Sequence, residues 1–285
     1  MKALHIYIIA LSLLIFNTSC EKVILIELNE ADQKIVVDAI VSNDSIQNYV
    51  ILSKSGGFYQ SNDFEAVIGA NVTITDDNGA SFVMSETADG YYTNPTLIGQ
   101  LKTTYNLEVI ADNQTITGST YLPDTTRLDS LSYFWNSGGF GDPAWFVLMH
   151  WSDEGAEENY YRFKPTIKGV ELIASSATSS YYRFKPTING YKENGISLLD
   201  DMLINGITTQ YPLFDVEVDT FDILTVEFIE IDKGTYNYLK VLGEIDSGDN
   251  GTSAAPGNPD SNLSGEALGF FGGYAITRAS VIIEP

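Results

Sequence analysis

Residues 71–84 read NVTITDDNGASFVM, and this stretch decides the fold class. Val72 and Ile74 alternate with threonines, which is the period of a strand with one buried face. Residues 76–79 (DDNG) supply turn chemistry, because Asn and Gly accept positive φ angles. An apolar pattern returns at 81–84. The stretch therefore predicts an antiparallel hairpin.

The same pattern extends outward on both sides. Short apolar or alternating segments, separated by turn residues about every ten positions, favour an antiparallel sandwich. They lie at 35–41, 49–52, 90–92, 105–109 and 114–121. We expect an immunoglobulin-like or prealbumin-like β-sandwich over residues 33–123. The boundary falls at Leu122-Pro123-Asp124, since Pro ends a strand and Asp favours a turn.

Residues 124–285 are also rich in strand patterns, which predicts a second antiparallel β domain, either a sandwich or barrel-like. The expected strands include 128–135, 145–151, 214–219 and 224–229, and Phe270, Tyr274 and residues 281–283 predict a final strand or two that return into the sheet. One short helix is expected near 233–242, with Asp232 as its N-cap. The fold class predicted for the whole chain is all-β.

An internal duplication interrupts this second half. Residues 160–169 read YYRFKPTIKG and residues 181–190 read YYRFKPTING. One interpretation is a duplicated strand that only enlarges a hairpin. The other is a doubled aromatic and basic edge for a partner, because Tyr, Arg and Phe are common interface anchors. The candidate partner-binding residues are Tyr160, Tyr161, Arg162, Phe163, Tyr181, Tyr182, Arg183 and Phe184, with Lys164 and Lys185 extending the basic strip.

The N-terminus has the organisation of an export signal. Lys2 precedes an apolar run at 6–16, which is too short for a membrane span but suits a signal-peptide core. Residues 17–20 (NTSC) resemble the lipobox of bacterial lipoproteins. We expect residues 1–19 to be a signal peptide, Cys20 to carry the lipid, and residues 20–32 to form a tether. The alternative is an ordinary secretory signal in which Cys20 has no special role.

Composition excludes several function classes. The chain has 15 Lys and Arg against 38 Asp and Glu, a net charge of -23, so we expect no nucleic-acid partner. A single cysteine allows neither an internal disulfide nor a zinc–thiolate cluster. Beyond His5 the only histidine is His150, and no Gly-x-Ser-x-Gly motif accompanies it. We expect no enzyme activity, no metal and no cofactor, with an envelope hydrolase as a remote alternative.

Several motifs together resemble the Bacteroidetes lipoprotein family known as domain of unknown function 4249. They are SCEKVI at 19–24, VTITDDNG at 72–79, GYY at 90–92, NYYRF at 159–163, ISLLDD at 196–201, NG at 205–206, TVEFIEIDKGTYNYLKVL at 225–242 and SNLSGEALGFFGGYAITRASV at 261–281. The duplicated YYRFKPT segment departs from the single copy expected there. The resemblance implies an outer-membrane lipoprotein that accompanies TonB-dependent receptors, and it carries over no catalytic residue.

These observations lead to one functional expectation and one alternative. The first is a non-enzymatic binding or accessory subunit, held to outer-membrane lipid by acylated Cys20. It would work with a TonB-dependent receptor in nutrient capture, and its ligand would be an unidentified small molecule, peptide or glycan. The alternative is a structural or adhesive cell-surface lipoprotein. Which face of the outer membrane it occupies stays open.

Overall fold

The 71–84 hairpin forms as its residue pattern predicts. In this computed structural model Val72 pairs with Met84 and Thr75 with Ser81. The Asp76 carboxylate accepts the backbone N–H groups of Asn78 and Ala80 at 3.0 and 2.7 Å and so closes the turn. The structure describes residues 32–56, 64–138, 143–155, 157–172, 178–183, 197–213, 216, 218–247 and 258–285. Apart from residue 32, these belong to one compact unit.

The described chain is built from strands and one helix, which confirms the all-β prediction. The first half contains β1 (Ile35–Ser42), β2 (Tyr49–Lys54), β3 (Asn71–Asp76), β4 (Ser81–Ala88), β5 (Tyr91–Thr93), β6 (Thr103–Ala111) and β7 (Gln114–Leu122). The second half contains β8 (Leu128–Asn136), β9 (Ala144–Ser152), β10 (Tyr160–Leu172), β11 (Thr178–Arg183), β12 (Ser197–Asp200), β13 (Thr208–Pro212), β14 (Ile223–Ile231), α2 (Lys233–Ser247) and β15 (Leu268–Ile282).

Most strands join one open sheet, in the order β11-β10-β14-β15-β1-β2-β5-β4-β3-β6-β7, with β12 also paired to β10. A second sheet has the order β13-β9-β8. Neither sheet closes into a barrel within the described residues, so the second half takes the sandwich alternative.

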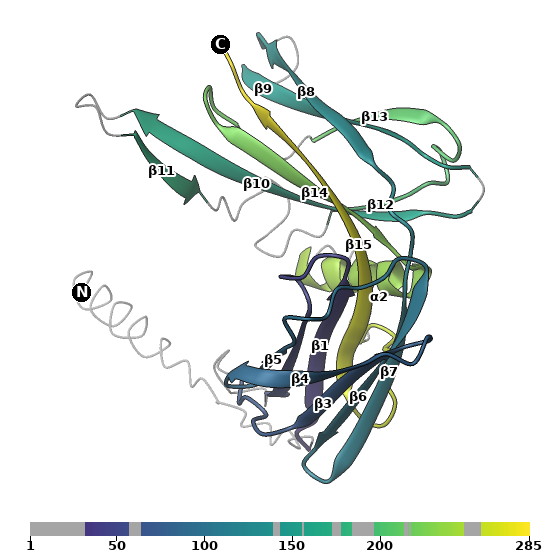
Figure 1. Cartoon of the computed structure of the whole chain (residues 1–285). Helices are drawn as coiled ribbons and strands as arrows, with labels where there is room; N and C mark the ends of the chain where they lie inside the picture. Colours follow the sequence, from purple (N-terminus) through teal and green to yellow (C-terminus); the bar gives the residue numbers. More distant parts are fainter. Residues whose placement is uncertain are drawn as a thin grey trace, which may run out of the picture. The chain divides into compact units, whose positions relative to one another are not determined.

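Strand β15 serves both halves of the molecule. Its first residues pair in parallel with β1, and residues from Tyr274 onward pair antiparallel with β14. Figure 1 shows it as one yellow strand that runs from β1 to β14. Two glycines permit this path: a Cβ at Gly269, where φ is +97°, would lie 2.0 Å from the carbonyl oxygen of Val37, and one at Gly273 would lie 2.5 Å from that of Tyr121. The division at 123/124 stays a prediction, to which the structure adds this shared strand.

Two apolar cores lie on one side of the large sheet, which we call the core face. In the first core, residues of β1, β2 and β15 pack against β3, β6 and β7; Val37, Leu52 and Phe271 are fully buried there. In the second, β10 and β14 pack against β8, β9 and β13 around Trp151 and Phe228. The exposed rings of Phe134 and Trp135 lie at the end of the β8–β9 pair.

Helix α2 covers the middle of the opposite side, which we call the helix face. Its Tyr238 ring stacks on Phe270 of β15 at 4.5 Å, and its Tyr236 ring lies 4.8 Å from Tyr160 of β10. Asp232 caps the helix as predicted, because its carboxylate accepts the Thr235 N–H at 2.6 Å. The helix continues five residues beyond the predicted end at 242, since Gly243 weakens a helix without stopping it.

Two segments differ from their sequence-based expectation or lie outside the described residues. The alternation at 214–219 predicts a strand, but the described residues of this segment are not in one. Val216 and Val218 are nevertheless buried in the second core, so at these two positions the alternation reflects burial and not strand pairing. The signal peptide, Cys20 and nearly all of the tether lie outside the described residues.

Candidate functional site

Strand β10 separates the first YYRF copy between the two faces of the sheet. Tyr161 and Phe163 point to the core face and are 0% and 2% exposed, so neither offers a surface to a partner. Tyr160 and Arg162 lie on the helix face, because alternate residues of a strand point to opposite sides. Lys164 follows on the helix face. Partner contact by Tyr160 and Arg162 stays a prediction.

The second YYRF copy lies at a different place. Tyr181, Tyr182 and Arg183 are in β11, which pairs antiparallel with the end of β10, so that Tyr181 lies opposite Gly169. This is the arrangement that a strand duplication enlarging a hairpin predicts. The side chains of these three residues, and Phe184 as a whole, lie outside what the structure describes.

Arg162 and Lys164 gather around one buried tyrosine of β15. The guanidinium carbon of Arg162 and the ammonium nitrogen of Lys164 lie 5.6 and 5.4 Å from the centroid of the Tyr274 ring. Arg162 also donates a hydrogen bond of 2.6 Å to the Tyr274 hydroxyl. Both cations are half-buried, and Tyr274 is 3% exposed. We call this group, with Asp38 and Tyr49 beside it, the Arg162–Lys164 site.

Burial dominates the electrostatics of this site. Loss of hydration, followed by repulsion from Arg162, lowers the pKa of Lys164 to about 8. Asp38 on β1 is exposed to solvent. Loss of hydration nevertheless raises its pKa, although Arg162 and Lys164 attract its charge. Burial and the nearby Asp38 carboxylate raise the pKa of Tyr49 on β2. Perturbed groups of opposite charge that gather in this way are typical of functional sites.

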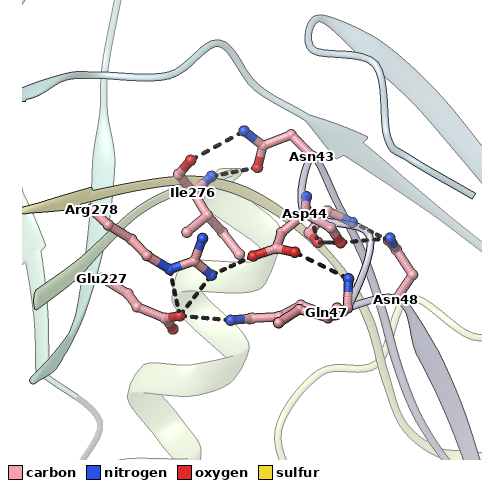
Figure 2. A network of polar contacts seen from close by, with 9 residues as sticks. Asn43, Asp44, Gln47, Asn48, Glu227, Ile276 and Arg278 are labelled. Carbon is pink, nitrogen blue, oxygen red and sulfur yellow. Dashed lines mark hydrogen bonds and ion pairs between the residues drawn. The ribbon is translucent and has the colours of Figure 1, made fainter. Parts of the chain in front are cut away.

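The cross-strand neighbour of Lys164 is a carboxylate that other groups already engage. Lys164 pairs in register with Glu227 of β14, and Glu227 pairs with Arg278 of β15. Figure 2 shows one oxygen of Glu227 accepting hydrogen bonds from Arg278, at 3.0 and 2.8 Å, and from Gln47, at 2.7 Å. Arg278 is also paired with Asp44. Within the described part of the chain, Lys164 has no ion pair.

The loop between β1 and β2 fixes this arrangement. The Asn43 side chain accepts the N–H of Ile276 at 2.7 Å and donates to its carbonyl at 3.1 Å, so it continues the ladder where β1 leaves β15 (Figure 2). The Asn48 amide accepts the Ser42 N–H at 2.6 Å and donates to the Leu97 carbonyl at 2.9 Å. The loop therefore holds Asp44 and Gln47 over the Glu227–Arg278 pair.

Aromatic side chains surround the charged groups. Tyr49 stacks on Tyr91 of β5 with ring centroids 5.9 Å apart, and Tyr238 of α2 stacks on Phe270. Three of these rings, those of Tyr49, Tyr91 and Tyr238, are half-buried and keep accessible surface. The site thus offers two cations, tyrosine hydroxyls and ring faces, a combination suited to binding a small polar molecule.

Sequence reasoning found Arg162 and noted Lys164, but it missed Asp38, Tyr49 and Tyr274. Only strand pairing places β1, β2 and β15 in one sheet with β10, where β14 lies between β10 and β15. The one local signal was Asp38 itself, a charged residue inside the apolar segment IVVDAIV. A carboxylate within such a strand calls for a partner or a function.

A concavity of about 700 Å³ lies elsewhere, over β3, β6 and β7. Hydroxyl and amide groups of Thr73, Asn106, Thr117 and Asn262 line it together with others. Its wall is structural, because Asn262 bonds the Phe271 backbone at 2.7 and 3.0 Å and Ser264 bonds Thr117. It contains no cation, so we place the candidate site at Arg162 and Lys164.

The described residues give no support to a metal site or to a catalytic histidine. Among the described residues, no three His, Cys, Asp or Glu side chains are grouped to hold a metal ion. His150 Nε2 lies 2.6 Å from Ser132 Oγ on the neighbouring strand, so one of its ring nitrogens has a hydrogen-bond partner, as expected for a packed histidine. No helix in the described ranges combines the length and apolar character needed to cross a bilayer.

Comparison with known proteins places this fold in a family. No curated protein matches the chain. A family model described as "Domain of unknown function (DUF4249)" matches residues 21–280, which span almost everything beyond the N-terminal apolar segment. The stretches behind the resemblance lie in this range, except that the first begins at residue 19 and the last ends at residue 281, and they include parts of β10, β14, α2 and β15. The chain therefore belongs to the DUF4249 family.

Proposed function

We propose that this chain is a lipid-anchored, non-enzymatic binding subunit of the outer membrane that works with a TonB-dependent receptor in nutrient capture or uptake. One observation carries the binding role: Arg162 and Lys164 are half-buried beside accessible tyrosines, and neither has an ion pair within the described residues. Cations held in this way lose hydration, a cost that a bound ligand of opposite charge can offset.

The location rests on the N-terminal sequence. A short basic start, an apolar run at 6–16 and small residues before Cys20 support export and lipidation. Each methylene of an attached acyl chain contributes about 0.8 kcal/mol in the bilayer, so several chains would hold the protein firmly.

Replacement of the cysteine tests the anchor. We expect Cys20→Ser to leave the membrane fraction after cell fractionation, and to lose the acyl mass in mass spectrometry of the N-terminal peptide. Ser19→Ala is the matched control, because it keeps a small residue before the cysteine, and it should stay membrane-bound. A Cys20→Ser protein that remains with the membrane would contradict the anchor.

Purification from the native envelope tests the partnership. Extraction in mild detergent should recover the full chain together with a receptor barrel, identified by mass spectrometry. The same extraction of Cys20→Ser should recover much less of it, because the lipid brings the two proteins to one membrane. Recovery of the lipoprotein alone after gentle extraction would contradict a stable receptor complex.

A further inference from the structure

We propose that the Arg162–Lys164 site binds the acidic group of a small organic anion, a carboxylate or a phosphate, whose remaining atoms lie against the surrounding tyrosines. The inference rests on the proposed binding function and names its ligand class. It concerns two half-buried cations that form no ion pair within the described residues, although the charges of Asp38 and Glu227 act on them from nearby.

Arg162 and Lys164 differ from most other described cations in that they form no ion pair. Six of the described Lys and Arg residues form ion pairs, which is expected where acids outnumber bases so strongly: Lys34, Lys54, Lys102, Arg127, Lys233 and Arg278. Arg162 and Lys164 are the half-buried exceptions in the described ranges. Loss of hydration without a partner destabilises a charged group, so a fold keeps such a pair most readily where a ligand supplies the negative charge.

The second step is the unused donor capacity of the same two residues. Arg162 donates one N–H to the Tyr274 hydroxyl, while its buried Nε has no hydrogen-bond partner in the described structure. The Lys164 ammonium faces the Tyr274 ring instead of an acceptor. A guanidinium matches the two oxygens of a carboxylate or phosphate, and a neighbouring ammonium adds a point charge.

The third step concerns the neighbours that set affinity. Asp38 is the carboxylate that competes with an incoming anion, since its charge interacts with both Arg162 and Lys164. Glu227 competes less, because Arg278 and Gln47 engage it. Removal of the Asp38 charge should therefore strengthen anion binding, whereas removal of the Lys164 charge should weaken it.

Proton binding by Lys164 makes the affinity dependent on pH. The charged and titratable groups that face its ammonium are Arg162 on its own strand, Glu227 on β14, Tyr274 and Arg278 on β15, and Asp38 on β1. Arginines stay charged throughout. Above a pH of about 8 the ammonium loses its proton, so anion affinity should fall while Arg162 retains part of it.

The experiment compares matched probes on the purified full chain by isothermal titration calorimetry at constant ionic strength. The probes are benzoate, phenyl phosphate and inorganic phosphate, with benzamide as the neutral counterpart of benzoate. We expect Kd values of about 1 mM for the two aromatic anions near neutral pH and at least about tenfold weaker binding of benzamide. Comparison of benzoate with phenyl phosphate identifies the preferred acid, and inorganic phosphate measures what the acidic group contributes alone.

Variants assign the binding to the site. Lys164→Met should weaken benzoate about tenfold or more, Asp38→Asn should tighten it severalfold, and Lys240→Met, at an exposed position on α2, should leave it unchanged. A circular dichroism melt of each variant confirms folding. Benzamide binding as tightly as benzoate, unchanged binding by Lys164→Met, or no binding of any anion up to about 10 mM would overturn the inference. Receptor co-purification is measured separately, so an anion-binding protein without a receptor contradicts only the proposed function.

Discussion

Replacing Lys164 by Met should make the protein more stable while it weakens anion binding. Met has nearly the length of the Lys stem and fills the same space over Tyr274, but it carries no charge that needs hydration. Because no ion pair is lost among the described residues, removal of the ammonium takes away a cost and leaves the packing in place. A site retained only for stability would respond in the opposite direction.

The magnitude follows from the proton equilibrium of the ammonium. Lys164 has a pKa of about 8 in the folded chain, against an ordinary value of 10.5. At about 1.36 kcal/mol per pH unit, the charged form destabilises the folded state by at most about 3 kcal/mol. The side chain keeps some contact with water, so we expect about 1–2 kcal/mol of stabilisation at neutral pH.

The pH dependence has a definite sign. Below pH 8 the ammonium is charged in both the folded and the unfolded chain, so the folded state is destabilised by the full amount. Between pH 8 and 10.5 the folded chain has released this proton and the unfolded chain has not, so stability rises with pH. The stabilisation by Lys164→Met should therefore be largest near neutral pH and disappear towards pH 10.5.

Urea unfolding of the full chain, followed by tryptophan fluorescence at several pH values, measures this difference. The comparison of wild type with Lys164→Met cancels the titration of other groups, including the tyrosines. Lys240→Met is the control, and its stability should stay within about 0.5 kcal/mol of wild type. A loss of more than about 1 kcal/mol in Lys164→Met near neutral pH would refute the reasoning, since it would mean that the ammonium is stabilised in place.

Three further predictions concern the scaffold of the site and are tested by urea unfolding. Trp151→Ala should lower the free energy of unfolding by about 3–5 kcal/mol, because it empties the middle of the second core. Trp135→Ala, at the exposed end of the β8–β9 hairpin, should lower it by less than about 1 kcal/mol. Similar losses in the two variants would contradict the two-core description. Asn43→Ala should lower the free energy of unfolding by about 2–3 kcal/mol, because the N–H and the carbonyl of Ile276 on β15 both lose their hydrogen-bond partner. No change in stability would mean that water replaces the side chain at little cost. Thr126→Val removes a hydroxyl donor that lies 2.7 Å from the Glu230 carboxylate, whose pKa is raised by burial. The variant should lose about 1–3 kcal/mol of stability, and this loss should grow as pH rises and the Glu230 carboxyl ionises. A loss of stability that does not depend on pH would contradict a link to the Glu230 charge.

The amino-acid sequence by itself determines those features that depend on near neighbours. Alternation and turn residues at 71–84 specify the hairpin, because burial of one strand face and closure of a turn are settled within a few residues. Asp232 begins the helix for the same reason. The segment 214–219 marks the limit of such reasoning. Val216 and Val218 are buried as the alternation suggests, but the described residues of this segment are not in a strand, because strand pairing needs a neighbour that the local pattern does not supply.

Only the tertiary structure decides which distant segments meet. The parallel pairing of β1 with β15 joins residues more than two hundred positions apart and extends one sheet through both cores. Together with the pairing of β10 with β14 and of β14 with β15, it gathers Asp38, Arg162, Lys164 and Tyr274 on one face. The pKa of Lys164 depends on burial and on charges from three other strands. Such quantities are set by distances in space, so no local pattern of residues encodes them.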